Sequence, residues 1–243
     1  MRISIIVPAY NEEGLLATSL AQIKIAAVEI EQRGWAWELI VCDNNSTDRT
    51  PAIAAAAGAT VVFEPVNQIG RARNRGASAA TGDWLWFIDG DSWPSSELFG
   101  AVIAEMDRQR AVAVGTTLAF DDVDPLYAFM AGLWKLWSVV GSRMAGSFIA
   151  VEAEAFRAIG GFSREFFAGE ELDLSRRLIR WGRQQTPRRR VKVLRGVPLK
   201  TSGRKSKLYS HRENARFLGR LLWSPWRTLK RRESCDLWYD GRR

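Results

Sequence analysis

The sequence predicts an open, doubly wound α/β sheet flanked by helices. Two observations predict this fold class. Apolar runs rich in β-branched residues alternate with helical segments of ten or more residues, and three of those runs end in polar clusters. The chain has 243 residues, of which 47% are apolar, so it can bury a sizeable core. Ligands of such sheets bind outside the carboxyl ends of the strands, so we expect the functional site there.

Apolar runs predict five strands. The first is broken by Pro8 and is typical of a buried parallel strand that delivers its end to a loop. In order, the runs are residues 3–10, 37–43, 60–65, 83–89 and 111–120. The polar ends expected to share one crevice are Tyr10 and Asn11, Asp43 to Asn45, and Asp89 to Asp91.

Helical segments lie between these runs, at residues 11–34, 45–58, 70–82 and 95–110. Their expected N-caps are Ser46 or Thr47 for the second and Ser95 or Ser96 for the fourth. The first three are expected to end at Gly34, Gly58 and Gly82. A later amphipathic helix begins at Glu170, with apolar residues Leu172, Leu174, Leu178 and Trp181.

Charge divides the chain into an acidic body and a basic tail. The net charge is +8, but residues 176–243 hold 22 of the 35 Lys and Arg and only four of the 27 acids. Such asymmetry indicates an anionic partner, which leaves nucleic acid, a membrane surface and phosphorylated substrates open.

Neither a leader nor a membrane span is expected. The opening apolar run is too short for a signal peptide, and the stretch from Leu126 to Gly141 is too short to cross a bilayer and contains Lys135. Cys42 and Cys235 show neither metal spacing nor a disulfide framework, which is typical of a cytoplasmic protein.

Asp89 and Asp91 stand one residue apart at a strand end, with Gly90 expected to permit a tight backbone. Two carboxylates in this position suit Mg²⁺ or Mn²⁺, which prefer hard oxygen ligands and substrate phosphates. The alternative is a plain turn.

Glu170 and Glu171 begin the later amphipathic helix. Acids in a first helical turn are favoured by the helix dipole alone. The functional interpretation is that a carboxylate facing the crevice acts as a general base on an attacking hydroxyl.

Four segments together, SIIVPAYNEE, ELIVCDNNSTDRT, ARNRGASAATGDWLWFIDGDSWP and IGGFSREFFAGEELDLSRRLIRWG, resemble the family 2 glycosyltransferases in order and spacing. The resemblance implies the GT-A fold, with a mixed sheet, and inverting transfer from a nucleotide-activated sugar. It implies a catalytic domain over residues 1–200, divided into a nucleotide-sugar half (1–95) and an acceptor half (96–200), followed by a basic, aromatic, helical extension (201–243).

The resemblance also implies a nucleotide site. Pro8, Ala9, Tyr10 and Glu12 match the first nucleotide-binding segment, where the tyrosine lies against the base. Asp43 and Asn44 match an acidic pair whose second member often reads uracil as aspartate. Because an amide donates as well as accepts, Asn44 leaves GDP and dTDP open beside the favoured UDP.

Further matched positions imply catalysis. Arg73 matches a basic position near the nucleotide and its phosphates, with a solvated helix charge as the alternative. Asp89 matches the ribose-side aspartate and Asp91 the metal-side aspartate of a DxD motif, while Glu171, beside Glu170, matches the base. The candidates from the tail are Arg204 or Lys205 for the donor diphosphate and His211 for the metal; solvated side chains are the alternative.

The extension also carries apolar residues among arginines, including Trp223 and Trp226. This pattern predicts adsorption to an anionic membrane, where a lipid-linked acceptor would lie, or packing against the catalytic domain or a second subunit. The competing classes are a nucleic-acid-binding protein, a nucleotidyltransferase and a catalytically inactive nucleotide-sugar binder; saccharide acceptors also stay open, as does the oligomeric state.

Overall fold

The computed structural model describes residues 1–121, 143–144, 146–204, 220 and 224–235. Its centre is an eight-stranded sheet with the order β3-β2-β1-β4-β7-β6-β8-β5. The strands are β1 (Arg2–Ala9), β2 (Ala36–Asp43), β3 (Thr60–Phe63), β4 (Trp84–Ile88), β5 (Ser92–Trp93), β6 (Ala111–Asp121), β7 (Phe148–Glu152) and β8 (Arg190–Ser202). The predicted open α/β sheet is therefore confirmed.

The sheet is parallel in its first half and mixed in its second. Strands β3, β2, β1 and β4 run parallel, β7 is antiparallel to both β4 and β6, β8 is parallel to β6, and β5 is antiparallel to β8. The ends of β1, β2 and β4 therefore lie next to one another, as the sequence predicts.

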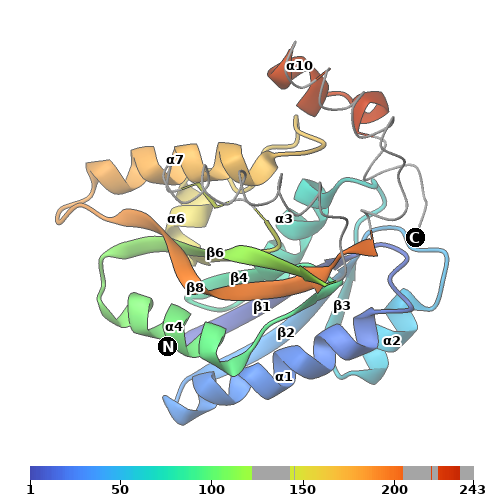
Figure 1. Ribbon diagram of the computed structural model, residues 1–243, viewed down its shortest axis with the longest axis horizontal. Helices are drawn as coiled ribbons and strands as arrows, with labels where there is room; N and C mark the ends of the chain where they lie inside the picture. Colours follow the sequence, from blue (N-terminus) through green and yellow to red (C-terminus); the bar gives the residue numbers. More distant parts are fainter. Residues whose placement is uncertain (122–142, 145, 205–219, 221–223, 236–243) are drawn as a thin grey trace.

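Helices cover both faces of the sheet (Figure 1). On one face lie α1 (Leu16–Gln32), α2 (Thr50–Ala56) and α4 (Ser96–Asp107); on the other lie α3 (Ile69–Ala79), α6 (Ala153–Ala158) and α7 (Glu170–Gln184). The C-terminal elements are α10 (Pro225–Leu229) and the 3-10 helix η1 (Arg232–Ser234).

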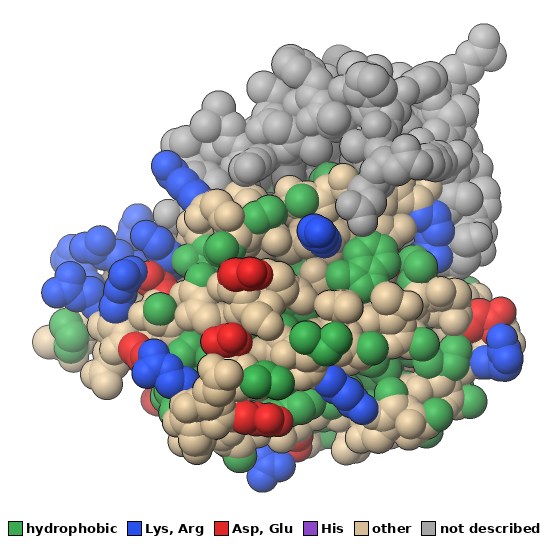
Figure 2. All heavy atoms as spheres, turned by 60° about the horizontal axis from the view of Figure 1, so that its bottom comes forward, with side chains coloured by type: hydrophobic (Ala, Val, Ile, Leu, Met, Phe, Trp, Pro, Cys, Tyr) green, Lys and Arg blue, Asp and Glu red, His purple; other side chains and the backbone are tan. Residues whose placement is uncertain are grey.

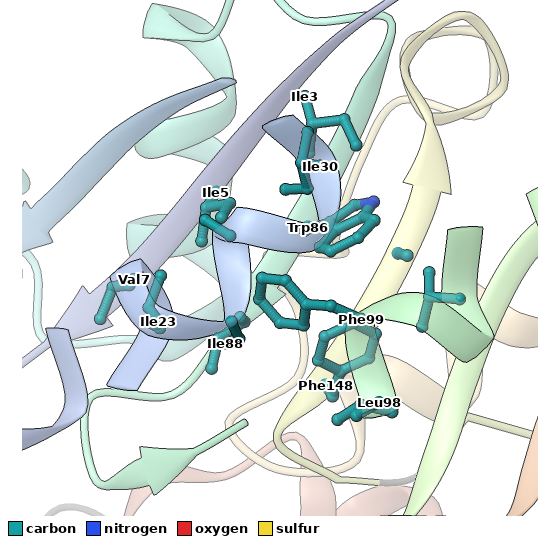
Figure 3. Close-up of a cluster of buried hydrophobic side chains, with 14 of the residues drawn as sticks. Ile3, Ile5, Val7, Ile23, Ile30, Trp86, Ile88, Leu98, Phe99 and Phe148 are labelled. Carbon is teal, nitrogen blue, oxygen red and sulfur yellow. The ribbon is translucent and has the colours of Figure 1, made fainter. Parts of the chain in front are cut away.

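Each face of the sheet has its own apolar core. Ile3 and Ile5 of β1 point into the core under α1 and α4, whereas Ile6 points into the core under α3 and α7. Figure 3 shows Trp86 in the first core, where its ring centre lies 4.8 Å from that of Phe99. Burial on both faces explains why β1 reads as a continuous apolar run.

Several predicted helix boundaries hold and two are wrong. Gly34 and Gly58 follow their helices with positive φ, and Ser95 caps α4 by accepting from Leu98 N at 3.2 Å. Neither Ser46 nor Thr47 caps α2, which begins at Thr50, where Asp48 Oδ1 accepts from the backbone N–H at 2.9 Å.

The helix expected to reach Gly82 ends instead at Ala79. A Cβ at Gly82 would lie 2.7 Å from the backbone nitrogen of Ser4, so this glycine permits a close approach between two backbones.

Among the described residues, no helix is long and apolar enough to cross a membrane. The stretch from Leu126 to Gly141 lies outside them. Cys42 and Cys235 are both buried, and they are not joined to each other by a disulfide.

Candidate active site

The carboxyl ends of β1 and β2 lie side by side at one edge of the candidate site. Their last residues, Ala9 and Asp43, are partners in register, and Asn44 N donates to Ala9 O at 2.8 Å. Asp43 Oδ1 accepts from Ser46 N at 3.0 Å, which turns the chain away from the sheet. Pro8, Ala9 and Asp43 thus lie at the carboxyl edge of the sheet, where the sequence predicts the crevice.

The Asn44 side chain is committed to the loop before α3. Its amide nitrogen donates to Val66 O at 2.6 Å and to Glu64 O at 3.2 Å, and its oxygen accepts from Gln68 N at 3.0 Å. Both amide protons are therefore engaged by backbone carbonyls, so Asn44 shapes the loop around the proposed base site.

Glu12 and Arg204 pair across the site. Arg204 Nη2 lies 3.0 Å from both carboxylate oxygens of Glu12, and Glu12 N donates to Thr50 Oγ1 at 2.8 Å. Tyr10, two residues earlier, is partly exposed. Because Arg204 pairs with Glu12, the residue that follows β8 by two positions lies beside the segment that follows β1, although the two are far apart in sequence. Lys205, the alternative to Arg204, and His211 lie outside the described residues.

Arg73 is buried at the centre of the site, where only 3% of its side chain is exposed. Its Nη2 lies 2.8 Å from Asp89 Oδ1, and its Nη1 lies 2.6 Å from Glu170 Oε1. Burial alone would lower the pKa of Arg73, but the two carboxylates raise it above its usual value. The alternative of a solvated helix charge is therefore wrong, and the guanidinium joins the end of β4 to the start of α7.

The two glutamates at the start of α7 differ in their surroundings. Glu170 is buried and paired with Arg73, whereas Glu171 is half-buried. Burial, with the neighbouring Glu170 carboxylate, raises the pKa of Glu171 to about 8. The geometry makes Glu170 an anchor of the helix and leaves Glu171 as the candidate base.

Further along α7, Asp173 and Arg177 form the structural i,i+4 pair that their spacing suggests, at 2.7 Å. Asp173 lies in the same first turn of α7 as the two glutamates.

The turn from Asp89 to Asp91 is fixed by backbone contacts. Asp89 N donates to Ser147 O at 3.1 Å, and Asp91 O accepts from Ser202 N at 3.0 Å. The steric role expected for Gly90 is not supported, because a Cβ there would meet its nearest atoms at an ordinary 3.5 Å and no positive φ requires glycine.

The donor set fits a hard divalent cation only in part. Asp89 and Asp91 supply carboxylate oxygens of the kind that Mg²⁺ and Mn²⁺ prefer. Within the described ranges, no group of three or more His, Cys, Asp or Glu side chains is placed to hold a metal. Asp89 gives one oxygen to Arg73, and Asp91 stays the predicted metal-side ligand.

Gln68, just before α3, has an organising role that the sequence did not reveal. It is 1% exposed, and its amide nitrogen donates to the backbone oxygens of Arg164 and Phe166, each at 2.8 Å. Since the backbone N–H of Gln68 donates to Asn44 Oδ1, Gln68 links the end of β2 to the loop before α7. A lone glutamine in a polar stretch carries no sequence signal for such a role.

A hollow of about 480 Å³ lies beside α7 and is lined by Ser163, Glu165, Phe166, Asp173, Arg177 and Lys230. Its acids and bases are paired with one another, as Asp173 with Arg177 and Glu165 with Lys230. Neither Asp91 nor Glu171 lines it. It is therefore not the predicted site at the strand ends.

Comparison with known proteins gives a family match: residues 4–160 match the model of glycosyl transferase family 2. An uncharacterized glycosyltransferase of Mycobacterium tuberculosis is 33% identical over 113 residues, which are 46% of this chain and 47% of that protein. The 4,4'-diaponeurosporenoate glycosyltransferase of Staphylococcus haemolyticus is 30% identical over 149 residues, or 58% of this chain and 38% of that protein. The chain thus spans half or less of these curated relatives.

Solved structures share the fold at low identity. The mannosyltransferase PcManGT from Pyrobaculum calidifontis, solved with GDP-Man and Mn²⁺, has a TM-score of 0.65 at 19% identity, covering 88% of this chain and 59% of that one. TarS of S. aureus, residues 1–349 with UDP, has a TM-score of 0.62 at 19% identity, covering 83% and 60%. The expected GT-A fold is confirmed.

Proposed function

Because the chain belongs to glycosyl transferase family 2, we propose that it moves a sugar from a nucleoside diphosphate donor to an acceptor hydroxyl with inversion at the anomeric carbon. One observation carries the proposal. A single guanidinium, that of Arg73, contacts both Asp89 of the DxD sequence and Glu170 beside the candidate base. These two contacts support the proposal that the residues assigned to the donor and those assigned to proton transfer form one site.

In the proposed mechanism, Glu171 removes the proton from the acceptor hydroxyl. That oxygen attacks the anomeric carbon on the face opposite the diphosphate, the bond from carbon to the diphosphate oxygen breaks, and the configuration inverts. Asp89 orients the ribose, and Arg73 keeps Asp89 and Glu170 in place. A Mg²⁺ or Mn²⁺ ion held by Asp91, with Asp89 beside it, would stabilise the charge of the diphosphate.

The donor base is proposed to lie against Tyr10, with UDP favoured and GDP and dTDP as the alternatives. Related folds have been solved with GDP-Man and with UDP, so the fold alone favours neither. The Asn44 amide nitrogen donates to two backbone oxygens of its own loop, so in this arrangement its protons do not serve to recognise the base by hydrogen bonds. Thermal-shift measurements with UDP-, GDP- and dTDP-sugars in Mn²⁺ would identify the donor. Stabilisation by RNA or DNA alone would contradict the proposal.

The acceptor is proposed to be a saccharide or a lipid-linked saccharide, bound against the acceptor half. We place the reaction in the cytoplasm, with the protein peripheral to the membrane if its acceptor is lipid-linked. The buried thiols of Cys42 and Cys235, which form no disulfide, support a reducing compartment.

Two substitutions test the catalytic roles. We expect Glu171→Gln to retain donor binding but to lower transfer by about 10² to 10⁴, the usual contribution of a general base. The exposed Glu154→Gln, in α6, serves as the control and should transfer normally. Unchanged turnover in Glu171→Gln would remove Glu171 as the base, and a complete lack of turnover in the unaltered protein would favour an inactive nucleotide-sugar binder.

Asp91→Ala tests the metal-side role. We expect it to abolish donor turnover in Mn²⁺, whether measured as hydrolysis or as transfer. Undiminished metal-dependent turnover in this variant would show that Asp91 does not hold the cation.

A further inference from the structure

Residues 224–235, the C-terminal segment, lie against the loop that leads into α7. Leu229 O accepts from Phe167 N at 2.8 Å and from Ala168 N at 3.4 Å. The Leu229 side chain also reaches Gly169, where an added Cβ would lie 3.3 Å from Leu229 Cδ1. These contacts hold the three residues that directly precede the Glu170–Glu171 pair.

Lys230 extends the contact to the earlier part of the same loop. Its ammonium pairs with Glu165 and lies 5.1 Å from the centre of the Phe166 ring. The C-terminal segment therefore touches every residue from Glu165 to Gly169.

The C-terminal segment is itself a small packed unit. Thr228 is buried and its hydroxyl donates to Arg220 O at 2.9 Å, while the buried Cys235 thiol lies 3.5 Å from Thr228 O. A helix as short as α10, with five residues, is not stable alone in water, so its order depends on such contacts and on the loop beneath it.

The opposite side of the loop is held by Gln68, whose amide nitrogen donates to the backbone oxygens of Arg164 and Phe166. The loop before α7 is thus fixed from α3 on one side and from the C-terminal segment on the other. Glu171 follows Gly169 by only two residues, so a shift of the loop moves its carboxylate.

We propose that Leu229 and Lys230 are positioning residues for glycosyl transfer, because the C-terminal segment clamps the loop that aims Glu171 at the acceptor. The proposal rests on the proposed function and assigns a role to a segment that lies beyond residues 4–160, the range of the family match.

Leu229→Asp tests the clamp in the full chain. It removes the apolar contact with Gly169 and places a carboxylate beside an acidic helix start. Small misplacements of reacting groups cost up to about 10²-fold in rate, so we expect turnover of the donor sugar to fall by about 10- to 100-fold while donor affinity changes by less than about twofold. Amide hydrogen exchange should rise at residues 167–173 in the absence of any ligand.

Ser234→Asp is the matched control, because it adds the same charge to the same segment at a residue that makes none of the loop contacts described above. It should match the unaltered protein in turnover and in exchange. A second pair of variants, Glu165→Lys and Lys230→Glu, breaks the ion pair without changing an apolar side chain. Each should lower turnover only a fewfold, because the pair is exposed. The double variant, which restores opposite charges, should recover the turnover of the unaltered protein.

The outcomes separate the two proposals. If the unaltered protein transfers no sugar from any donor, the proposed function fails. If Glu171→Gln transfers normally, Glu171 is not the base and the positioning role of the C-terminal segment is overturned with it. If Glu171→Gln is inactive but Leu229→Asp equals Ser234→Asp in turnover or in exchange, the clamp is wrong and the function stands. Loss of donor affinity together with turnover, or raised exchange throughout Leu229→Asp, would also overturn the positioning role, because either would reflect general unfolding.

Discussion

At the scale of single residues, the site depends on a buried charge arrangement. Burying ions is costly, and a buried guanidinium is tolerated because two carboxylates surround it. A hydrophobic side chain in place of Arg73 would leave Asp89 and Glu170 facing each other without a cation. The arrangement thus fixes the direction of both carboxylates, which a catalytic site requires.

The raised pKa of Glu171 predicts a pH dependence of catalysis. A base must be ionised to accept a proton, so kcat/KM should rise with pH and level off above the Glu171 pKa of about 8. The pH–rate profile of donor turnover measures this limb, which should be absent from the residual activity of Glu171→Gln. A profile that is already flat between pH 5 and pH 8 would contradict the assignment.

The raised pKa of Glu171 also makes the stability of the folded protein depend on pH. The folded protein holds the Glu171 proton more tightly than the unfolded chain, so this contribution to stability is present below the ordinary pKa of 4.5 and is lost as pH rises through about 8. Glu171→Gln should therefore raise the melting temperature at pH 9 but hardly at pH 4, without metal or donor. The exposed Glu154→Gln should show no such difference.

Residue identities could be predicted better than residue partners. The sequence places Asp89 and Asp91 after a strand and Glu171 at a helix start, as the structure has them. It did not indicate the hydrogen bonds of Asn44, and it indicated a steric role for Gly90. The structure commits Asn44 to its own loop and gives Gly90 no steric role. Such partners depend on loops whose path local sequence does not determine.

At the scale of elements, α3 orients several side chains of the candidate site. It presents Arg73 to the carboxylates and Asn74 to the backbone of Phe162, and Gln68 is its N-cap. Its position on the sheet depends on Gly76, where an added Cβ would lie 2.4 Å from Ile6 Cγ2 of β1. The helix can therefore approach the strand only because this residue lacks a side chain.

Gly76→Ala should push α3 away from β1. Overpacking of this kind costs about 1–3 kcal/mol, and the displaced Arg73 should lower turnover as well. Urea denaturation and donor turnover measure the two effects. The control is Gly14→Ala, where an added Cβ meets nothing within 4 Å. Equal stability of the two variants would show that α3 does not depend on the close approach.

The helices and strands could be predicted where the apolar periodicity is strong, but not where an element is fixed by residues far away in the sequence. The parallel strands and the start of α7 follow from apolar runs and helical spacing. The pairing of β5 with β8 and the insertion of β7 between β4 and β6 do not, because they join residues far apart in sequence. The cap of α2 was missed because Asp48, not an earlier hydroxyl, accepts the first N–H.

At the scale of the whole molecule, those basic residues of the C-terminal third that the structure describes occupy separate places. Figure 2 shows Lys and Arg side chains gathered at its left, the end where Figure 1 draws the connection between α7 and β8. Exposed arginines there include Arg188 and Arg190. The C-terminal segment exposes a second set, including Arg227 and Arg231, on the side of α7 that carries the loop before it. Charge alone therefore does not say which set meets an anionic surface.

Proximity to the candidate active site favours the second set, since a lipid-linked acceptor, if that is the substrate, would have to reach Glu171. We expect Arg227→Gln/Arg231→Gln to lose binding to phosphatidylglycerol vesicles in flotation, by roughly 30-fold if each cation contributes about 1 kcal/mol. Arg188→Gln/Arg190→Gln removes the same charge elsewhere and should bind as the unaltered protein does. These substitutions keep Leu229 and Lys230, whereas truncation would also release the loop before α7. Equal binding by both variants would exclude the C-terminal segment as the membrane contact and leave its packing on that loop as its role.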